Sequence, residues 1–402
     1  MVFLSVQAAV SSLTATAAAT SQIVPVTEDS GFWFANFTVG NATNLNLLVD
    51  TGSGDIIVNP GLYKAGPSAV NLHENFDNSY ATTQSNGGGT VKGPLYSDIV
   101  SIGNLSAKQH IGAANNETGI PHDGIVGFGP SSAEFPGRNA TAFVETLCRD
   151  GDLSECRFGL ALNSNKTGSL ILGELESSLY NTDLSVVPSS ESWTVNADIY
   201  VDGSVSSSDI SVVLDSGTAT IVGPIDQVSA IFNSTGIQGV RSGSSLFGYF
   251  PCDKPPTLGL GLPSQSDAAA AAKNHSAMLS NTSTVFNISP DQWAIANNGN
   301  NNCTALLSGQ DFGGESIWIF GQAFYTGLYV DHNMKDSVMG FASLATSLAS
   351  PLPRSTTDAT ATASASASPS ETNAAQDSGI MKVKKTAVLC AVVAMLTGAV
   401  LA

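Results

Sequence analysis

The chain carries little charge, and most of the charge that it carries is negative. Charged residues make up 12% of its 402 residues, and 15 Lys and Arg stand against 33 Asp and Glu, which gives a formal net charge of −18 at pH 7. A surface of this sign repels the phosphates of DNA and RNA, so the composition argues against nucleic acid as a partner. A hydrophobic fraction of 42% argues equally against disorder throughout the chain.

Histidine is also scarce, and the motifs of several kinds of active site are missing. The five histidines lie far apart in the sequence, so we expect them at the surface and expect no metal site. No G-x-S-x-G motif marks a serine nucleophile, and the glycines at 87–89 lack the G-K-[ST] of a phosphate-binding loop. Serine hydrolases and nucleotide-binding proteins therefore have little support.

Only five cysteines occur, and none of them belongs to a C-x-x-C pair. Cys390 lies in an apolar run at the C-terminus, which leaves four. An even number in an exported chain favours disulfide bonds in an oxidising compartment over a zinc site. We predict two disulfides, which join Cys148 to Cys156 and Cys252 to Cys303.

The N-terminus and the glycosylation motifs predict export. Residues 1–19 are apolar and small and end in an alanine-rich stretch, as in a secretory signal peptide, although no Lys or Arg lies near the start. We therefore expect a secreted glycoprotein. Acceptors of the N-x-[ST] type recur along the chain, at Asn36, Asn41, Asn104, Asn116, Asn139, Asn165, Asn233, Asn274, Asn281, Asn287 and Asn302.

The C-terminus predicts attachment to the cell surface. Residues 346–378 are rich in Ser, Thr, Ala and Pro, which favours an extended stalk. Residues 379–402 combine a short polar stretch with a terminal apolar run, the layout of a lipid-anchor (GPI) signal that is removed. We expect the anchor at Asn373 or, as a second choice, at Ser378, on the plasma membrane or the cell wall. A transmembrane helix is the alternative, but the apolar run is at the short limit for a membrane span.

Between these ends, short runs of β-branched and aromatic residues alternate with clusters of Gly, Asn, Asp and Ser. This alternation predicts strands joined by turns. Amphipathic helices are few, with candidates at 141–149, 225–232 and 268–279. The predicted fold class is therefore mainly β.

One pattern in this body occurs twice. Three apolar residues, an Asp-[ST]-Gly triplet and a hydroxyl residue make up both LLVDTGS at 47–53 and VVLDSGT at 212–218. Apolar segments that end in glycine follow downstream of each, DGIVG at 123–127 and IWIFG at 317–321. A single triplet is typical of an ordinary turn. The duplication instead predicts two related β lobes, 20–185 and 186–345, with a shared site in the cleft between them.

The duplicated pattern points to acid–base chemistry. Each triplet puts a carboxylate at the end of an apolar strand, where glycine permits a tight turn and the next hydroxyl can hydrogen-bond the carboxylate. Two carboxyls that face each other cannot both ionise cheaply, so they share one proton. One is then a base and the other an acid, and together they can deprotonate a water that attacks a carbonyl carbon and protonate the leaving nitrogen. This predicts amide hydrolysis at acid pH.

From about Phe32 to Ala342, the two motifs, their flanks and their order resemble those of the pepsin family of aspartic endopeptidases. VVLDSGTATIVGP resembles the family's second active-site strand, and DGIVGFG and WIFGQAFYTGLYVD resemble the segments beneath each aspartate. The resemblance implies a bilobal pepsin-like fold, protein or peptide substrates, no metal or organic cofactor, and a monomer. The stalk and anchor signal resemble those of fungal cell-surface members.

The resemblance also implies roles for particular residues. Asp50 and Asp215 match the catalytic pair, and Cys252 and Cys303 match the disulfide of the C-terminal lobe. Six neighbours match residues that support the pair: Gly52 and Gly217 beside the carboxylates, Thr51 and Ser216 with hydroxyls that bond across the lobes, and Ser53 and Thr218 with hydroxyls on the outer carboxylate oxygens.

The flap departs from the family's pattern. Aligning NGGGTVKGPLYSD with the β-hairpin flap puts Asn86 where a Tyr is usual, followed by Gly87 and Gly88, and Ile57 stands where the Trp that partners this Tyr is usual. Asn86 cannot supply an aromatic wall for the substrate, although Tyr80 could serve in a rearranged loop. The altered flap motivates an alternative function, a catalytically weak or inert surface protein that binds peptides or cell-wall material.

Overall fold

The computed structural model describes residues 20–82, 89–116, 119–131, 141–181, 183–190, 192–263, 284–296, 301–314, 316–345 and 391–392. Strands dominate this part of the chain, and its helices are short. The predicted mainly β fold class is confirmed. The signal peptide, the stalk, both candidate anchor residues and the expected helix at 268–279 lie outside the described residues.

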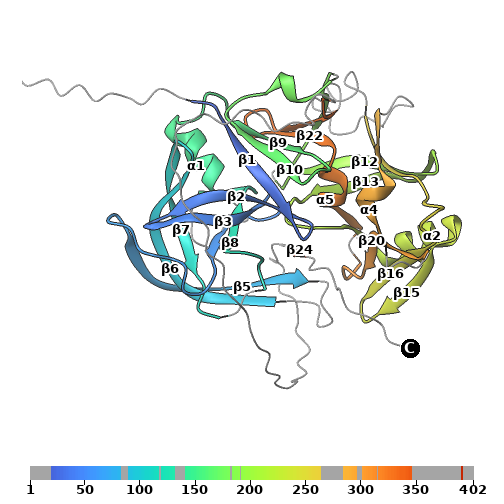
Figure 1. Cartoon of the computed structure of the whole chain (residues 1–402), viewed down its shortest axis with the longest axis horizontal. Coiled ribbons are helices and arrows are strands. Elements are labelled where there is room, and N and C mark those ends of the chain that lie inside the picture. The colour runs from blue at the N-terminus through green and yellow to red at the C-terminus, as the bar shows by residue number, and fades with distance from the viewer. Residues whose placement is uncertain are drawn as a thin grey trace, which may run out of the picture.

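Fourteen of the described strands form one sheet, which contains most of the blue and teal half of the molecule in Figure 1. Its order is β11-β23-β22-β9-β10-β1-β2-β3-β8-β4-β7-β6-β5-β24. The strands are β1 (Gln22–Asp29), β2 (Phe32–Val39), β3 (Ala42–Asp50), β4 (Ile56–Val58), β5 (Val70–Thr82), β6 (Gly89–Ile102), β7 (Leu105–Ala113), β8 (Gly124–Gly127), β9 (Arg157–Leu162), β10 (Thr167–Leu172), β11 (Ser185–Pro188), β22 (Leu328–Asn333), β23 (Val338–Ser343) and β24 (Ala391–Val392).

Ten further strands form a second sheet, of which β15, β16 and β20 lie at the opposite side of the molecule (Figure 1). Its order is β15-β16-β20-β14-β21-β13-β12-β17-β18, and β19 pairs with β20. The strands are β12 (Thr194–Val201), β13 (Ser204–Leu214), β14 (Ile221–Pro224), β15 (Gln238–Ser242), β16 (Ser245–Phe250), β17 (Leu258–Leu262), β18 (Thr284–Ile288), β19 (Ala294–Ala296), β20 (Cys303–Gln310) and β21 (Ile317–Phe320).

The repeat seen in the sequence is also a repeat of strand arrangement. In the first sheet, β3 runs parallel to β8, which pairs antiparallel with β4, and β4 runs parallel to β7. In the second, β13 runs parallel to β21, which pairs antiparallel with β14, and β14 runs parallel to β20. The strand that ends in each Asp-[ST]-Gly triplet is therefore held by the apolar segment that the sequence repeats downstream of it.

The two halves share part of the first sheet. Residues 328–333 return to the first half, where β22 pairs with β9, and β23 then pairs with β22 and with β11 at the boundary between the halves. In Figure 1, β9, β10 and β22 accordingly lie together between the two sides of the molecule. The lobe boundary at 185/186 stays a prediction, and the strand pairing adds that β22 hydrogen-bonds to β9 of the first half.

Four described helices and one 3₁₀ turn complete the fold. α1 and α2 correspond to the helices predicted at 141–149 and 225–232, and each ends at a glycine in the left-handed conformation, Gly151 (φ 77°) or Gly236 (φ 74°), which stops the helix without strain. The elements are α1 (Phe143–Asp150), the 3₁₀ turn (Ser177–Leu179), α2 (Ile225–Thr235), α4 (Pro290–Trp293) and α5 (Gln322–Tyr325).

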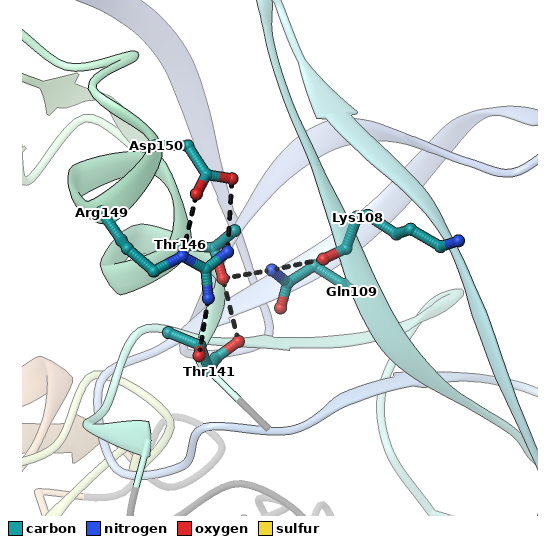
Figure 2. A network of polar contacts seen from close by, with 6 residues as sticks. All are labelled: Lys108, Gln109, Thr141, Thr146, Arg149 and Asp150. Carbon is teal, nitrogen blue, oxygen red and sulfur yellow. Dashed lines mark hydrogen bonds and ion pairs between the residues drawn. The ribbon is translucent and has the colours of Figure 1, made fainter. Parts of the chain in front are cut away.

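A polar network fixes α1 to β7 (Figure 2). Gln109 on β7 donates its side-chain amide to Thr146 Oγ1 at 2.7 Å, and Thr146 donates in turn to the carbonyl oxygen of Thr141. Arg149 binds both the Thr141 hydroxyl and the Asp150 carboxylate. The Gln109–Thr146 bond satisfies polar atoms that are buried between helix and sheet, whereas the contacts of Arg149 lie at the exposed end of the helix.

The structure contains both disulfides that the sequence predicts. Cys148 at the end of α1 is bonded to Cys156 before β9, with 5.2 Å between their Cα atoms. Cys252 after β16 is bonded to Cys303 at the start of β20, with a Cα separation of 5.1 Å. The second bond joins neighbouring antiparallel strands of one sheet.

Candidate active site

The two aspartates of the repeated motif lie together at the ends of two apolar strands. Asp50 is the last residue of β3, and Asp215 follows β13 directly. The residues before them are buried because β3 and β13 are central strands with a paired strand on each side. Neither aspartate is exposed, so both acids are removed from the water that solvates a carboxylate and depend on hydrogen bonds from the protein.

Hydroxyl residues bond across the two halves just behind these carboxyls. Thr51 Oγ1 donates to the carbonyl oxygen of Leu214 at 2.8 Å, and Ser216 Oγ donates to that of Val49 at 2.7 Å. The backbone N–H of Thr51 donates to Ser216 Oγ at 3.0 Å, and that of Ser216 donates to Thr51 Oγ1 at 2.9 Å. These four bonds relate the halves symmetrically and fix how far apart the aspartates stand.

The two glycines of the motifs allow the carboxyls to approach. Gly52 N–H donates to Asp50 Oδ1 and Gly217 N–H donates to Asp215 Oδ1, each at 2.8 Å. A Cβ atom on Gly52 would lie 2.5 Å from Asp215 Cγ, and one on Gly217 would overlap Asp50 Oδ1. Each glycine therefore contacts the carboxyl of the opposite aspartate, and a side chain at either position would displace that carboxyl.

The outer carboxylate oxygens accept from the hydroxyl residue that ends each motif. Ser53 Oγ donates to Asp50 Oδ2, and Thr218 Oγ1 donates to Asp215 Oδ2 at 2.7 Å. The structure thus brings together the catalytic pair and the six supporting residues that the resemblance assigns to it. Hydrogen bonds to both oxygens of each group hold the carboxyls in one plane relative to their strands.

The electrostatics of the pair favour a single shared proton. Burial, the negative charge of Asp50 and a hydrogen bond with Asp50 raise the pKa of Asp215 well above its usual value, against the opposing hydrogen bonds from Thr218 and Gly217. At acid pH the pair can therefore hold one proton and one negative charge, which supplies an acid and a base together. Among the described residues, no group of three or more His, Cys, Asp or Glu is arranged to hold a metal.

The segment predicted to form the flap includes the turn of the β5–β6 hairpin, and its role as a flap stays a prediction. Asn86, Gly87 and Gly88 lie outside the described residues, but the strand register pairs Tyr80 with Gly89 at the last described step of the hairpin. Ile57 is buried in an apolar cluster with Phe76, Val91 and Leu95 from the two strands of the hairpin. Ile57 therefore supports the hairpin by apolar packing, and its side chain cannot hydrogen-bond to it.

A polar contact at the same hairpin escaped the sequence analysis. Asn78 on β5 donates its side-chain amide to Asp55, a buried carboxyl in the turn after Ser53. Asp55 also accepts the N–H of Gly127 on its backbone oxygen. This contact ties the hairpin to the turn that carries the first aspartate, and an Asp two residues beyond a Ser gives no sign of it in the sequence.

Polar residues behind the dyad were also missed. Gln322 in α5 donates to the carbonyl oxygen of Ser216, and the Tyr325 hydroxyl lies 3.3 Å from Thr51 Oγ1. His332 on β22 lies 3.3 Å from the Tyr325 hydroxyl and is fully buried. The prediction that all the histidines lie at the surface is therefore wrong, because β22 is enclosed on both faces although it ends in the polar run Asp331–Asn333.

Comparison with known proteins agrees with this geometry. Residues 32–344 match the family model of eukaryotic aspartyl proteases. Secreted aspartyl protease 1 of Malassezia globosa is 27% identical over 304 residues, which cover 73% of this chain and 69% of the relative. Gastricsin of Cavia porcellus is 25% identical over 352 residues, which cover 80% of this chain and 82% of the relative.

A solved structure shows the same fold. The crystal structure of an aspartic proteinase from Irpex lacteus matches with a TM-score of 0.66 at 20% identity, and the match covers 82% of this chain and 99% of that one. The predicted bilobal pepsin-like fold and the predicted peptide-bond hydrolase are confirmed, and the inert binding protein is not favoured. The chain belongs to the eukaryotic aspartyl protease family and is an aspartic endopeptidase.

Proposed function

We propose that Asp50 and Asp215 are the catalytic pair and that Thr51, Gly52, Ser53, Ser216, Gly217 and Thr218 hold them in place. The observation that carries the proposal is the symmetric arrangement of two buried carboxyls, each bonded by its own glycine N–H and its own hydroxyl, with hydroxyls crossing between the halves. Such fixed groups need little reorganisation when charge develops during a reaction.

The raised pKa of Asp215 makes it the holder of the shared proton, and Asp50 carries the negative charge. Asp50 takes a proton from a water held between the carboxyls, and the oxygen attacks the carbonyl carbon of the scissile bond while Asp215 gives its proton to the carbonyl oxygen. Asp50 then gives its proton to the leaving nitrogen, and Asp215 recovers one from the tetrahedral diol as the C–N bond breaks. The pair ends with one proton, as it began.

The mechanism predicts an activity restricted to acid pH. When both carboxyls are ionised, the proton for the carbonyl oxygen is missing, and activity fades toward neutral pH. The protein secreted by a eukaryotic host can be tested for cleavage of a denatured protein from pH 3 to 8, beside Asp50→Asn and Asp215→Asn. We expect an acid optimum that either substitution and a statine-type inhibitor abolish. Undiminished cleavage at pH 8, or full activity of either variant, contradicts the proposal.

We further propose that the protein is a secreted monomer, glycosylated, and held at the cell surface by a lipid anchor at Asn373 or Ser378. The stalk composition at 346–378, the terminal apolar run, the disulfides and the name of the secreted Malassezia relative support this. None of the helices within the described ranges has the length and apolar character to span a bilayer.

The anchor has a direct test. Phosphatidylinositol-specific phospholipase C should release the protein from intact cells, and Asn373→Gln should abolish attachment if Asn373 is the anchor residue, with Ser378→Gln as the matched variant. Attachment that survives the lipase and both substitutions favours the membrane-spanning alternative.

A further inference from the structure

Two polar side chains behind the dyad, Tyr325 and His332, take no part in the chemistry above. Tyr325 ends α5, His332 lies in β22, and both are fully buried. The Tyr325 hydroxyl is 3.3 Å from Thr51 Oγ1 on one side and 3.3 Å from His332 Nε2 on the other. These three groups form a line from the sheet shared by the two halves to the hydroxyls that cross between them.

The bonds of Thr51 determine the direction of the donors in this line. The Thr51 hydroxyl has one proton, which it donates to the Leu214 carbonyl oxygen at 2.8 Å. The longer contact with Tyr325 must then run the other way, with the phenol as donor and Thr51 Oγ1 as acceptor. The phenol oxygen remains free to accept from His332 Nε2–H. Within the described residues His332 Nδ1 has no hydrogen-bond partner, which agrees with the proton on Nε2.

Neither side chain changes its charge in the working range of the dyad. His332 is stacked on Phe158, with 4.3 Å between ring centroids, and Trp193 packs edge-on against it. Burial lowers the pKa of His332 to about 3, and the nearby carbonyl oxygens of Phe158 and Val330 oppose this only in part. Burial and the charges of the two aspartates raise the pKa of Tyr325. The phenol therefore keeps its proton, and above about pH 3 the imidazole is neutral.

We propose that Tyr325, oriented by His332, is a positioning residue for the dyad, which acts by donating a hydrogen bond to Thr51. The proposal rests on the catalytic role of Asp50 and Asp215 argued above. Thr51 follows Asp50 in the chain and makes three of the four cross-half bonds, so its orientation sets the direction of the Asp50 carboxylate. The phenol supplies the second donor to Thr51 Oγ1 and keeps the hydroxyl aimed at Leu214.

Tyr325→Phe tests the proposal because it removes only the hydroxyl. Loss of one buried hydrogen bond should lower kcat about 3- to 10-fold, whereas KM should change less than twofold, because the phenol lies behind the dyad and touches no substrate. Rates are expressed per active site titrated with a statine-type inhibitor, so a smaller folded fraction does not count as slower catalysis. His332→Phe preserves the stacking and should give a smaller loss. The double variant should equal Tyr325→Phe, because His332 acts only through the phenol.

The matched control is Tyr329→Phe. Tyr329 is an equally buried tyrosine on β22, but its hydroxyl accepts the N–H of Glu176 at 3.3 Å instead of facing the dyad. This variant should keep the wild-type kcat. A wild-type kcat for Tyr325→Phe, or an equal loss for Tyr329→Phe, overturns the inference. Asp215→Asn is measured beside these variants to separate the catalytic role of the dyad from the positioning role of Tyr325. If Asp215→Asn remains active, the proposed function fails. If Asp215→Asn is inactive and Tyr325→Phe is unaffected, only the positioning role is refuted.

Discussion

Asp331 is a buried carboxyl in the sheet that joins the two halves, and its ionisation should make the fold sensitive to pH. It lies on β22 opposite Gly159 of β9 and Gly340 of β23, and it is 2% exposed. Asp331 Oδ2 is 3.4 Å from Arg157, whose guanidinium also binds Glu155 at 2.9 Å. In the described part of the chain, Asp331 Oδ1 has no hydrogen-bond partner.

The free-energy cost of ionising Asp331 in the folded protein follows from the shift of its pKa. Burial raises the pKa of Asp331 from 3.8 to about 7, because desolvation outweighs the attraction of Arg157. A tenfold change in proton affinity is worth about 1.4 kcal/mol, so the ionised form of Asp331 costs about 4 kcal/mol in the folded state. Between pH 4 and pH 7 the unfolded chain has lost this proton and the folded protein has kept it. The free energy of unfolding therefore falls as pH rises through this window and levels off above it.

Asp331→Asn should remove this dependence, because the amide has a similar shape and carries no charge at any pH. Urea unfolding at pH 4 should give variant and wild type within about 1 kcal/mol of each other, whereas at pH 7.5 the variant should be more stable by about 3 to 4 kcal/mol. The raised pKa of Asp215 gives a slope of the same sign, but it is present in both proteins and cancels in the difference. Asp209→Asn is the matched control, since it makes the same change at an exposed position with φ 51°, which Asn tolerates.

The difference in unfolding free energy between Asp331→Asn and wild type, followed against pH, tests whether Asp331 keeps its proton in the folded protein. If the unfolding free energies of Asp331→Asn and wild type stay parallel from pH 4 to 7.5, the carboxyl does not keep its proton in the folded protein, and the reasoning is refuted. If Asp209→Asn reproduces the gain, net charge is responsible and burial is not.

Three further predictions concern the dyad and the disulfides. Thr218→Ala removes a hydrogen bond that lowers the pKa of Asp215, so the alkaline limb of kcat/KM against pH should move upward by about half to one pH unit, and a downward shift contradicts this role. Gly217→Ala places a methyl group on Asp50 Oδ1 and should lower kcat/KM at least about 100-fold in protein that remains folded by circular dichroism. Because the Cys252–Cys303 bond spans 51 residues and the Cys148–Cys156 bond spans 8, their replacement by serine pairs should cost about 4 and about 2.5 kcal/mol of unfolding free energy, and the reverse order contradicts the loop-entropy argument.

The dyad could be predicted from the sequence because its chemistry is local. Asp50 and Asp215 are each followed within three residues by the glycine and the hydroxyl that bond the same carboxyl. Duplication of such a unit is visible without knowledge of the fold. The bond between Cys252 and Cys303 was predictable for a different reason, since the four cysteines outside the C-terminal apolar run leave few possible pairings.

Tyr325 and His332 could not be found in this way. Their partners lie far away in sequence, and Thr51 is 274 residues from Tyr325. His332 stands in a polar run, Asp331–Asn333, which is typical of a strand end in solvent, yet every residue of β22 is buried because β9 and β23 flank it and Phe158 and Trp193 cover it. Strand pairing between distant segments decides the burial, and no local pattern encodes that pairing.

The same long-range pairing couples the fold to the chemistry. The cross-half bonds of Thr51 and Ser216 span more than 160 residues, so the dyad exists only while the halves are docked. Asp331 lies in the sheet that docks them and is the chain neighbour of His332, which contacts Tyr325 behind Thr51. A rise in pH therefore removes the shared proton of the dyad and, through Asp331, weakens the support of the residues that position it. The ionisation of the dyad thus limits activity to acid and that of Asp331 lowers stability at neutral pH, so Asp331→Asn should extend the stability of the protein to neutral pH without extending its activity.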